Sequence, residues 1–207
     1  SAVFAFANIV IQAAINSLGT IVIAASSAAF NIEIFAYYVL NSFSQACTTF
    51  VGQNYGAGQI KRCKKILLLC ILEDAIASAA VISLVLLSGR VLLSVFNSNP
   101  EVIEIGYTRL LIILSAYTFS MLYENMSGYL RGFGDSLIPA VLTVIGVCAV
   151  RITWIYTVFQ THRTFTSIMI AYPVSLFTTA LLIFIALMIY RPSRRYAAAN
   201  ETGSGEI

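Results

Sequence analysis

The chain has 207 residues, of which 59% are hydrophobic and only 10% are charged, and its mean hydropathy is +0.87. Soluble domains carry about 25% charged residues, so the nine acids and twelve bases of this chain cannot cover a water-soluble fold of its size. The composition excludes a soluble protein and predicts an all-α, polytopic membrane protein that has the lipid bilayer as its solvent. The net charge of +3 does not indicate a nucleic-acid partner.

Charges, glycines and prolines divide the sequence into six apolar stretches, each close to the roughly 20 residues that a membrane-spanning helix needs. The joins between them are short and polar, among them residues 31–33, and none is long enough for a soluble domain. We expect a bundle of six transmembrane helices over residues 1–190 and a cytoplasmic, disordered basic tail at 191–207. The expected helices are 2–24, 34–53, 64–88, 103–126, 137–159 and 165–190.

The first stretch does not resemble a cleaved signal peptide, because no basic region precedes it. The opening residues read as if a longer chain had been cut just before this helix. We therefore expect a fragment or one half of a larger assembly.

Basic residues outside the stretches are distributed unevenly between the two membrane faces. Because Lys and Arg collect in cytoplasmic loops, the richer face is predicted to be cytoplasmic, and an even number of spans places both termini there. That face holds eight bases, Lys61, Arg62, Lys64, Lys65, Arg131, Arg191, Arg194 and Arg195, and the other face holds two, Arg90 and Arg163.

Signatures of metal or enzyme chemistry are missing from the sequence. The four cysteines form no C-x-x-C pair, and the chain has one histidine, His162, in an expected outer loop. No Ser/His pair, H-E-x-x-H or paired-Asp motif is present. We expect neither a metal site nor a catalytic residue, and we interpret the cysteines as small apolar side chains.

Two of the expected helices carry a polar stripe along one face. Amides cost free energy in hydrocarbon unless they are paired or wet, so each stripe faces another helix or a water-filled cavity. Contacts between helices, worth about 0.6 kcal/mol each, are one explanation, but three amides in line favour a cavity wall that binds substrate. The stripes are Asn8, Gln12 and Asn16 on the first helix, and Asn41, Gln45, Thr48 and Gly52 on the second.

Two adjacent carboxylates, Glu73 and Asp74, lie inside the third stretch, roughly 13 Å from its basic end. Adjacent helical residues point about 100° apart, so one carboxylate can face a cavity and exchange an ion while the other pairs with a polar group. A shifted helix start would instead place both near the lipid headgroups. Both are candidates for ion coupling.

A third candidate for ion coupling, Glu124, lies at the inner end of the fourth stretch. It shares a helix face with Tyr117 and Ser120, which makes Tyr117 a candidate for the cavity wall. The alternative is an interfacial acid that pairs with Arg131.

Two arginines, Arg109 and Arg151, also fall inside stretches. Glu101 and Glu104 lie at a similar depth, so we expect them to pair with these arginines in a structural role.

Two glycine-rich loop motifs are the most specific features of the sequence. Neither is a phosphate-binding loop, because the first lacks the Gly-Lys-Ser/Thr ending and no strand precedes the second. Each motif places small residues where helices end and where backbones approach closely. Asp135 is predicted to cap the fifth helix, which has Pro139 in its early turns. The residues are Gly52, Gln53, Asn54, Gly56 and Gly58 in the first motif, and Gly128, Arg131, Gly132, Gly134 and Asp135 in the second.

These loops identify a family. Asn-Ser-Leu-Gly-Thr at 16–20, GQNYGAGQIKRCKK at 52–65 and LRGFGDSLIP at 130–139 resemble the multidrug and toxic compound extrusion (MATE) transporters, in order and spacing, over residues 1 to about 190. The resemblance implies twelve spans in two six-helix lobes around a central cavity. The basic tail makes this chain similar to the second, C-terminal lobe, with an N-terminal lobe as its partner.

The resemblance also implies a secondary antiporter of the plasma (inner) membrane. It would export small organic, often cationic, compounds in exchange for H⁺ or Na⁺, with no cofactor beyond that ion. Some members carry a carboxylate on the first helix of this lobe, where this chain has Asn8, Gln12 and Asn16. The coupling acid is then expected at Glu73, Asp74 or Glu124, or in the other lobe.

A homo-oligomeric pore or structural membrane protein is the alternative. A second copy of the chain would then replace the missing lobe, and the polar stripes would line the pore.

Overall fold

The computed structural model describes residues 2–192, with side chains from residue 5 onward. The described residues form helices and short joins with no strand among them, which confirms the all-α prediction. The elements are α1 (Ala2–Asn16), α2 (Thr20–Gly56), α3 (Ile60–Phe96), α4 (Pro100–Gly132), α5 (Leu137–Thr143), the π-helical η1 (Val144–Ala149), α6 (Val150–Thr161) and α7 (Phe165–Tyr190).

Five helical segments are long and apolar enough to cross a membrane, namely α2, α3, α4, α7 and the continuous segment Leu137–Thr161. The described apolar part of α1, Ala5–Asn16, is shorter. With α5, η1 and α6 counted as one helix, the bundle has the predicted six helices and is that of a multi-pass membrane protein. Most of the tail expected at 191–207 lies outside the described residues.

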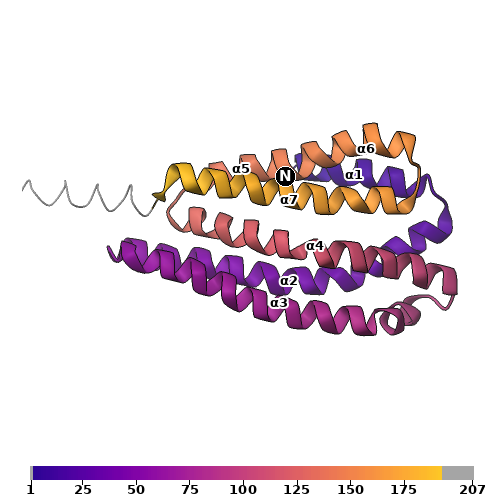
Figure 1. The fold of residues 1–207 in the computed structure, drawn as a ribbon, viewed down its shortest axis with the longest axis horizontal. Coiled ribbons are helices and arrows are strands. Elements are labelled where there is room, and N and C mark those ends of the chain that lie inside the picture. Colours follow the sequence, from indigo (N-terminus) through magenta and orange to yellow (C-terminus); the bar gives the residue numbers. More distant parts are fainter. Residues whose placement is uncertain (1, 193–207) are drawn as a thin grey trace, which may run out of the picture.

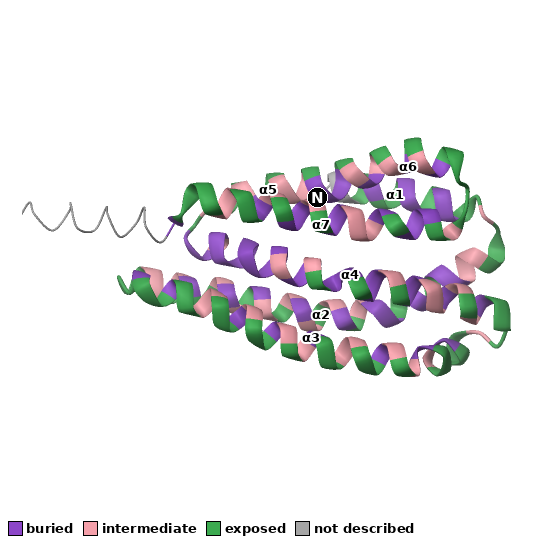
Figure 2. Ribbon diagram, in the orientation of Figure 1, coloured by how far each residue is buried: buried purple, intermediate pink, exposed green. Residues whose placement is uncertain are grey.

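Helix α4 lies at the centre of the bundle, between α2 and α3 on one side and α1, α6 and α7 on the other (Figure 1). It is also the most continuously buried helix in Figure 2. The outward faces are apolar and exposed, with Leu87 on α3 and Phe35 on α2 as clear examples. Such surfaces suit hydrocarbon, where every backbone group is satisfied within its own helix.

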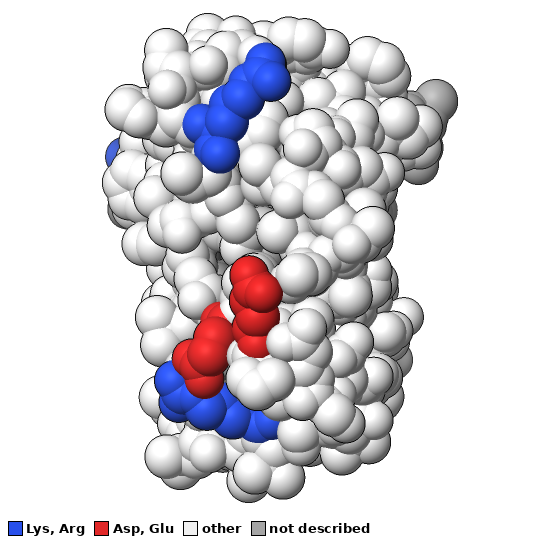
Figure 3. Space-filling view, turned by 90° about the vertical axis from the view of Figure 1, so that its right-hand side faces the viewer, with Lys and Arg blue, Asp and Glu red and all other residues white. Residues whose placement is uncertain are grey.

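The joins at 57–59 and 133–136 lie at the same end of the bundle as the end of α7, and the joins at 17–19, 97–99 and 162–164 lie at the opposite end (Figure 1). The first end carries the described members of the eight-base set, and the second carries Arg90 and Arg163. Figure 3 faces the second end, where a basic side chain is separated by uncharged surface from a group of acids and a base. The uneven distribution of bases expected from the sequence is therefore present in three dimensions.

The predicted boundary between the first two helices is wrong. The helix breaks at residues 17–19, where Gly19 adopts φ +103°, a conformation that favours glycine. Residues 31–33 lie inside the uninterrupted α2, where the Asn31 side chain donates to the Ser27 carbonyl at 3.0 Å. At 37 residues, α2 is about 55 Å long and extends beyond a hydrocarbon core of about 30 Å.

Close backbone contact between α4 and α2 occurs at the second glycine motif. A Cβ added to Gly128 would lie 2.5 Å from the Ser44 carbonyl oxygen, and one added to Gly132 would lie 2.6 Å from the Val51 Cβ. These two positions thus have the close approach expected of a small-xxx-small pair. Gly56 of the first motif has open space instead.

The two glycine motifs meet at one end of the bundle, where the rings of Tyr55 and Phe133 lie 5.1 Å apart. The expected cap of the fifth helix is wrong. Its N-cap residue is Ser136, one position later, and no side chain caps it. The Asp135 Oδ2 atom is buried without a hydrogen-bond partner among the described residues.

The helix that follows changes its winding at η1, the π-helical segment. Gly146 in η1 has no room for a side chain, because Thr179 of α7 lies directly against it. Pro173, six residues before Thr179 in α7, removes one backbone hydrogen-bond donor from that helix. Wider turns of this kind occur often at functional sites, and this one ends two residues before Arg151.

Candidate functional site

A cavity of about 670 Å³ opens on one side of the bundle. Its walls come from α1, α2, α4, η1, α6 and α7, and α3 contributes no residue. The lining combines apolar side chains with amides, hydroxyls and three ionised groups, Glu33, Arg109 and Arg151. A cavity of this volume and composition suits a small organic molecule.

Three of the six residues predicted for the cavity wall line it, namely Asn8, Gln12 and Tyr117. The other three do not. Asn16 lies at the exposed end of α1 and accepts a hydrogen bond of 2.8 Å from Gln12. Asn41 and Gln45 lie further along α2, outside the lining. As substrate-binding residues, the three that line the cavity remain a prediction.

An ion pair between α2 and α4 forms one wall of the cavity. The Arg109 Nε atom donates to Glu33 Oε2 at 2.9 Å and Nη2 donates to Glu33 Oε1 at 2.5 Å, so the pair is bidentate. Nη1 donates to Ser26 Oγ at 2.7 Å. Each nitrogen of Arg109 therefore has an acceptor, and the charge is balanced by a buried carboxylate.

The second arginine of the cavity, Arg151 on α6, has a different environment. Its Nε atom donates to Ser175 Oγ at 2.9 Å, and its Cζ atom lies 4.1 Å from the centre of the Tyr172 ring. The same ring lies 5.7 Å from Arg109 Cζ. Tyr172 is thus placed between two cations, and no carboxylate pairs with Arg151 among the residues described.

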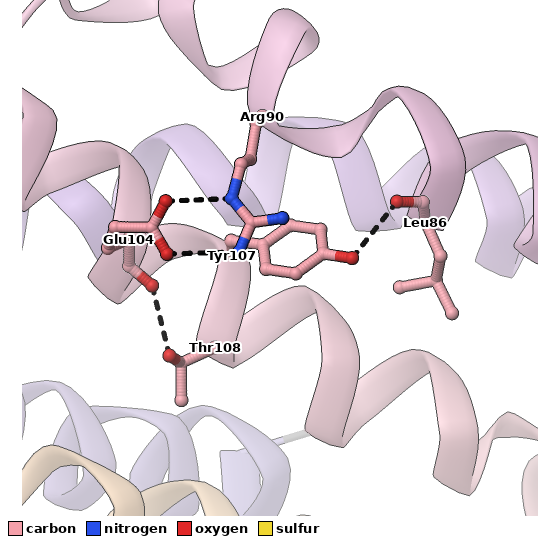
Figure 4. A network of polar contacts seen from close by, with 5 residues as sticks. All are labelled: Leu86, Arg90, Glu104, Tyr107 and Thr108. Carbon is pink, nitrogen blue, oxygen red and sulfur yellow. Dashed lines mark hydrogen bonds and ion pairs between the residues drawn. The ribbon is translucent and has the colours of Figure 1, made fainter.

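The predicted acidic partners of these arginines are wrong. Glu104 instead binds Arg90 of α3 with two contacts of 2.7 and 3.1 Å, and Arg90 Cζ stacks 4.0 Å from the Tyr107 ring (Figure 4). The Tyr107 hydroxyl donates to the Leu86 carbonyl at 3.2 Å. This network joins α3 to α4 at the surface, away from the cavity.

Glu33 is the functional candidate that the sequence reasoning missed, since it was assigned to a join between helices. One signal was available. Ser26 and Glu33 are seven residues apart and share a helix face, a spacing that appears only when α2 is extended back to Thr20.

The three candidates for ion coupling do not meet at one site, and none lines the cavity. Glu73 is exposed on α3. Asp74 is fully buried and accepts hydrogen bonds from Ser78 at 2.7 Å and from Asn125 at 2.6 Å. The interpretation that adjacent carboxylates face different surroundings agrees with this geometry, and their role in transport remains a prediction.

Glu124 precedes Asn125 on α4 and accepts a hydrogen bond of 3.2 Å from the Tyr37 hydroxyl, which itself lines the cavity. Arg131 does not pair with this carboxylate directly. Its Nη2 atom donates to Ser44 Oγ at 2.8 Å, and that hydroxyl donates to the Glu124 carbonyl at 2.7 Å. Asp74 of α3 is therefore bound by Asn125, the residue that follows Glu124 on α4, and neither carboxylate lines the cavity.

Comparisons with known proteins show similarity to this chain in sequence and in fold. The MatE family model matches residues 1–157. "Probable multidrug resistance protein NorM" of Thermotoga maritima is 27% identical over 150 residues, covering 72% of this chain and 31% of that protein. "Multidrug and toxin extrusion protein 1" of Oryctolagus cuniculus is 28% identical over 130 residues, covering 62% and 23%.

A solved structure, described as the crystal structure of MATE in complex with MaD3S, superposes with a TM-score of 0.81 at 16% identity, which establishes the fold. The match covers 91% of this chain and 42% of that one. The chain thus spans less than half of the relatives that it matches. With three quarters of its residues matched by the family model, the chain belongs to the MATE family of membrane transporters.

Proposed function

We propose that this chain forms one six-helix lobe of a secondary antiporter that exports small organic compounds, cationic ones among them, in exchange for H⁺ or Na⁺. The observation that carries the proposal is the cavity of about 670 Å³ within a bundle whose outer faces are apolar. Polar groups inside a membrane are costly and mark substrate or ion pathways. Family membership supports the same activity.

The partner in this proposal is an N-terminal lobe that closes the cavity from the other side. Substrate sites of such transporters lie near the bilayer midplane, between two repeats that rock against each other. Two relatives whose names refer to multidrug resistance or extrusion are matched over 31% and 23% of their lengths, which supports a second lobe.

We further propose that the basic end of the bundle faces the cytoplasm and that the membrane is the plasma (inner) membrane. The gathering of Lys61, Arg62, Lys64, Lys65, Arg131 and Arg191 at one end supports this orientation.

Transport in proteoliposomes tests the proposal. The chain, together with its N-terminal lobe where the two are separate, is reconstituted and loaded with a fluorescent organic cation. We expect uphill movement of the cation that requires an opposing H⁺ or Na⁺ gradient. A homo-oligomeric pore would instead let the cation leak down its own gradient, whether or not an ion gradient is present.

The buried carboxylate on α3 gives a sharper prediction for coupling. Asp74→Asn keeps the side-chain shape but cannot release a proton, so we expect unchanged substrate binding and at least a tenfold loss of gradient-driven export. Glu73→Gln is the matched comparison, and we expect it to lower export less than Asp74→Asn, because Glu73 is exposed on the same helix. Export at the wild-type rate in both variants would assign coupling to Glu124 or to the other lobe.

A further inference from the structure

A second hollow, a groove of about 350 Å³, lies at the basic end of the bundle, where α3 begins and α7 ends (Figure 1). Its walls come from α3, α4, α7 and the two residues that follow α7. It shares no residue with the cavity described above. Both α3 and α7 pack along α4. The groove therefore joins the two sides of the bundle that α4 separates.

Two bases, Lys64 of α3 and Arg191 after α7, line this groove. The Arg191 Nε atom donates to the Met188 carbonyl at 2.9 Å, which holds the guanidinium against the end of α7. Both bases are exposed, and neither forms an ion pair within residues 5–192. Three further exposed bases lie on the first two turns of α3, namely Lys61, Arg62 and Lys65. The groove therefore carries positive charge that the described carboxylates do not balance.

The wall next to these bases is apolar. Leu67 and Leu68 lie one turn after Lys64, and Leu187 lies one turn before Arg191, so these leucines lie about 5 Å deeper along the bundle than the charges. Leu67 and Leu187 pack against a small buried cluster at this end. Leu68 is 67% exposed, so the apolar wall continues onto the outer face of α3. The groove thus suits a molecule with an anionic head and a hydrocarbon chain.

The order of these walls along the bundle favours a lipid over a free anion. A free anion would bind the two bases but leave the apolar wall in contact with water. A phospholipid in the bilayer already has its phosphate at the level of the interfacial bases and its chains at the level of the leucines. A zwitterionic lipid carries an amine that cancels its phosphate charge, so an anionic lipid balances the groove better.

We propose that this groove binds one anionic phospholipid. Its phosphate lies between Lys64 and Arg191, and an acyl chain lies along Leu67, Leu68 and Leu187. The lipid belongs to the leaflet that the basic end of the bundle faces. It contacts α3 and α7, on opposite sides of α4, and therefore stabilises the packing of both against that helix. This proposal does not rest on the proposed antiport.

Native mass spectrometry of the full chain, released from detergent micelles, tests the proposal. The probes are dioleoyl phosphatidylglycerol, which is anionic, and dioleoyl phosphatidylcholine, which has the same chains and is zwitterionic. We expect one molecule of phosphatidylglycerol to bind about tenfold more tightly than phosphatidylcholine, because each base near a membrane surface favours an anionic lipid a few-fold. Phosphatidylglycerol should also raise the Tm of the wild-type chain more than phosphatidylcholine does.

Variants separate this groove from the general charge of the basic end. Lys64→Gln combined with Arg191→Gln removes both bases of the groove and should abolish the preference for phosphatidylglycerol. Lys61→Gln combined with Arg62→Gln is the matched control, because it removes the same charge from the same end but outside the groove, and most of the preference should remain. Leu68→Ser shortens the apolar wall and should weaken both lipids while the preference persists.

Three results would overturn the proposal. These are equal affinity for the two lipids in the wild-type chain, a preference that survives the loss of Lys64 and Arg191, and an equal loss in the control pair. Where the double variant does not fold, as judged by gel filtration, the two single variants replace it, and an undiminished preference in both contradicts the site.

Competition by free glycerol phosphate distinguishes the two sources of the anionic group. Little competition is expected, because this ion has no chain to cover the leucines, and competition at the affinity of the lipid would overturn the proposal. No substrate or ion gradient is present in these measurements. Failure of export in proteoliposomes would therefore refute the proposed antiport and leave the lipid site intact.

Discussion

Helix α4 carries two ion pairs, at Glu104 and at Arg109, whose surroundings are opposite. In the Arg90–Glu104 pair the side chains are 57% and 58% exposed, and in the Glu33–Arg109 pair both are 5% exposed. Both pairs are bidentate and both join α4 to a neighbouring helix. Similar geometry therefore occurs in two dielectric environments.

The difference separates an interaction that stabilises little from one that must stay intact. An exposed pair contributes about 0–1 kcal/mol, because water and salt screen it. In a buried pair, attraction and desolvation nearly cancel, but removing one partner leaves an uncompensated charge. Glu33 and Arg109 thus fix the wall of the cavity, whereas Arg90 and Glu104 only add to the packing of α3.

Breaking the buried pair should give the largest effect. Glu33→Gln leaves Arg109 charged and without its carboxylate, so we expect a loss of about 3–5 kcal/mol in the free energy of unfolding. Denaturant unfolding in detergent micelles measures it. Glu101→Gln in the first turn of α4 is the control and should cost less than about 1 kcal/mol. A loss below 1 kcal/mol for Glu33→Gln would mean that water reaches Arg109 in the folded state.

Removing both charges should restore much of that loss. Glu33→Leu combined with Arg109→Met fills the space with apolar groups and leaves no ion behind, so the double variant should unfold less readily than Glu33→Leu alone. We expect a coupling free energy of about 2 kcal/mol from the double-mutant cycle. Additive effects of the two single variants would show that each residue acts through other contacts.

Composition and spacing predicted the six-helix bundle because lipid imposes simple requirements on length and polarity. The boundary between α1 and α2 was wrong because polar residues at 31–33 read as a join, although Glu33 is stabilised by a partner 76 positions away. Only tertiary packing reveals such a partner. Gly19, whose positive φ breaks the helix, was present in the sequence but appeared inside an apolar run.

The sequence predicted only part of the candidate site. Helical periodicity assigns residues to a shared face, and it correctly grouped Asn8 with Gln12. It does not say which neighbour that face meets, so Asn41 and Gln45 were predicted at the cavity wall, although the part of α2 that lines the cavity ends at Tyr37. The prediction paired Arg109 with Glu101 or Glu104 because they lie at a similar depth in the membrane. Its actual partner, Glu33, is on another helix.

The exposed pair should give the smallest effect and a distinct dependence on salt. Glu104→Gln removes the carboxylate, but Arg90 remains solvated and keeps its stacking on the Tyr107 ring at 4.0 Å. We expect a loss of at most about 1 kcal/mol at low ionic strength, and almost none near 1 M salt, where the screening length falls to about 3 Å.

Dissolved salt screens the buried Glu33–Arg109 pair much less, so the destabilisation by Glu33→Gln should be the same at both salt concentrations. Unfolding of the two variants, measured side by side against the wild-type chain, checks this contrast. Tyr107→Leu in the Glu104→Gln background shows how much of the remaining stability comes from stacking. Equal salt dependence in the two glutamate variants would place Glu33 in water and remove the distinction between the pairs.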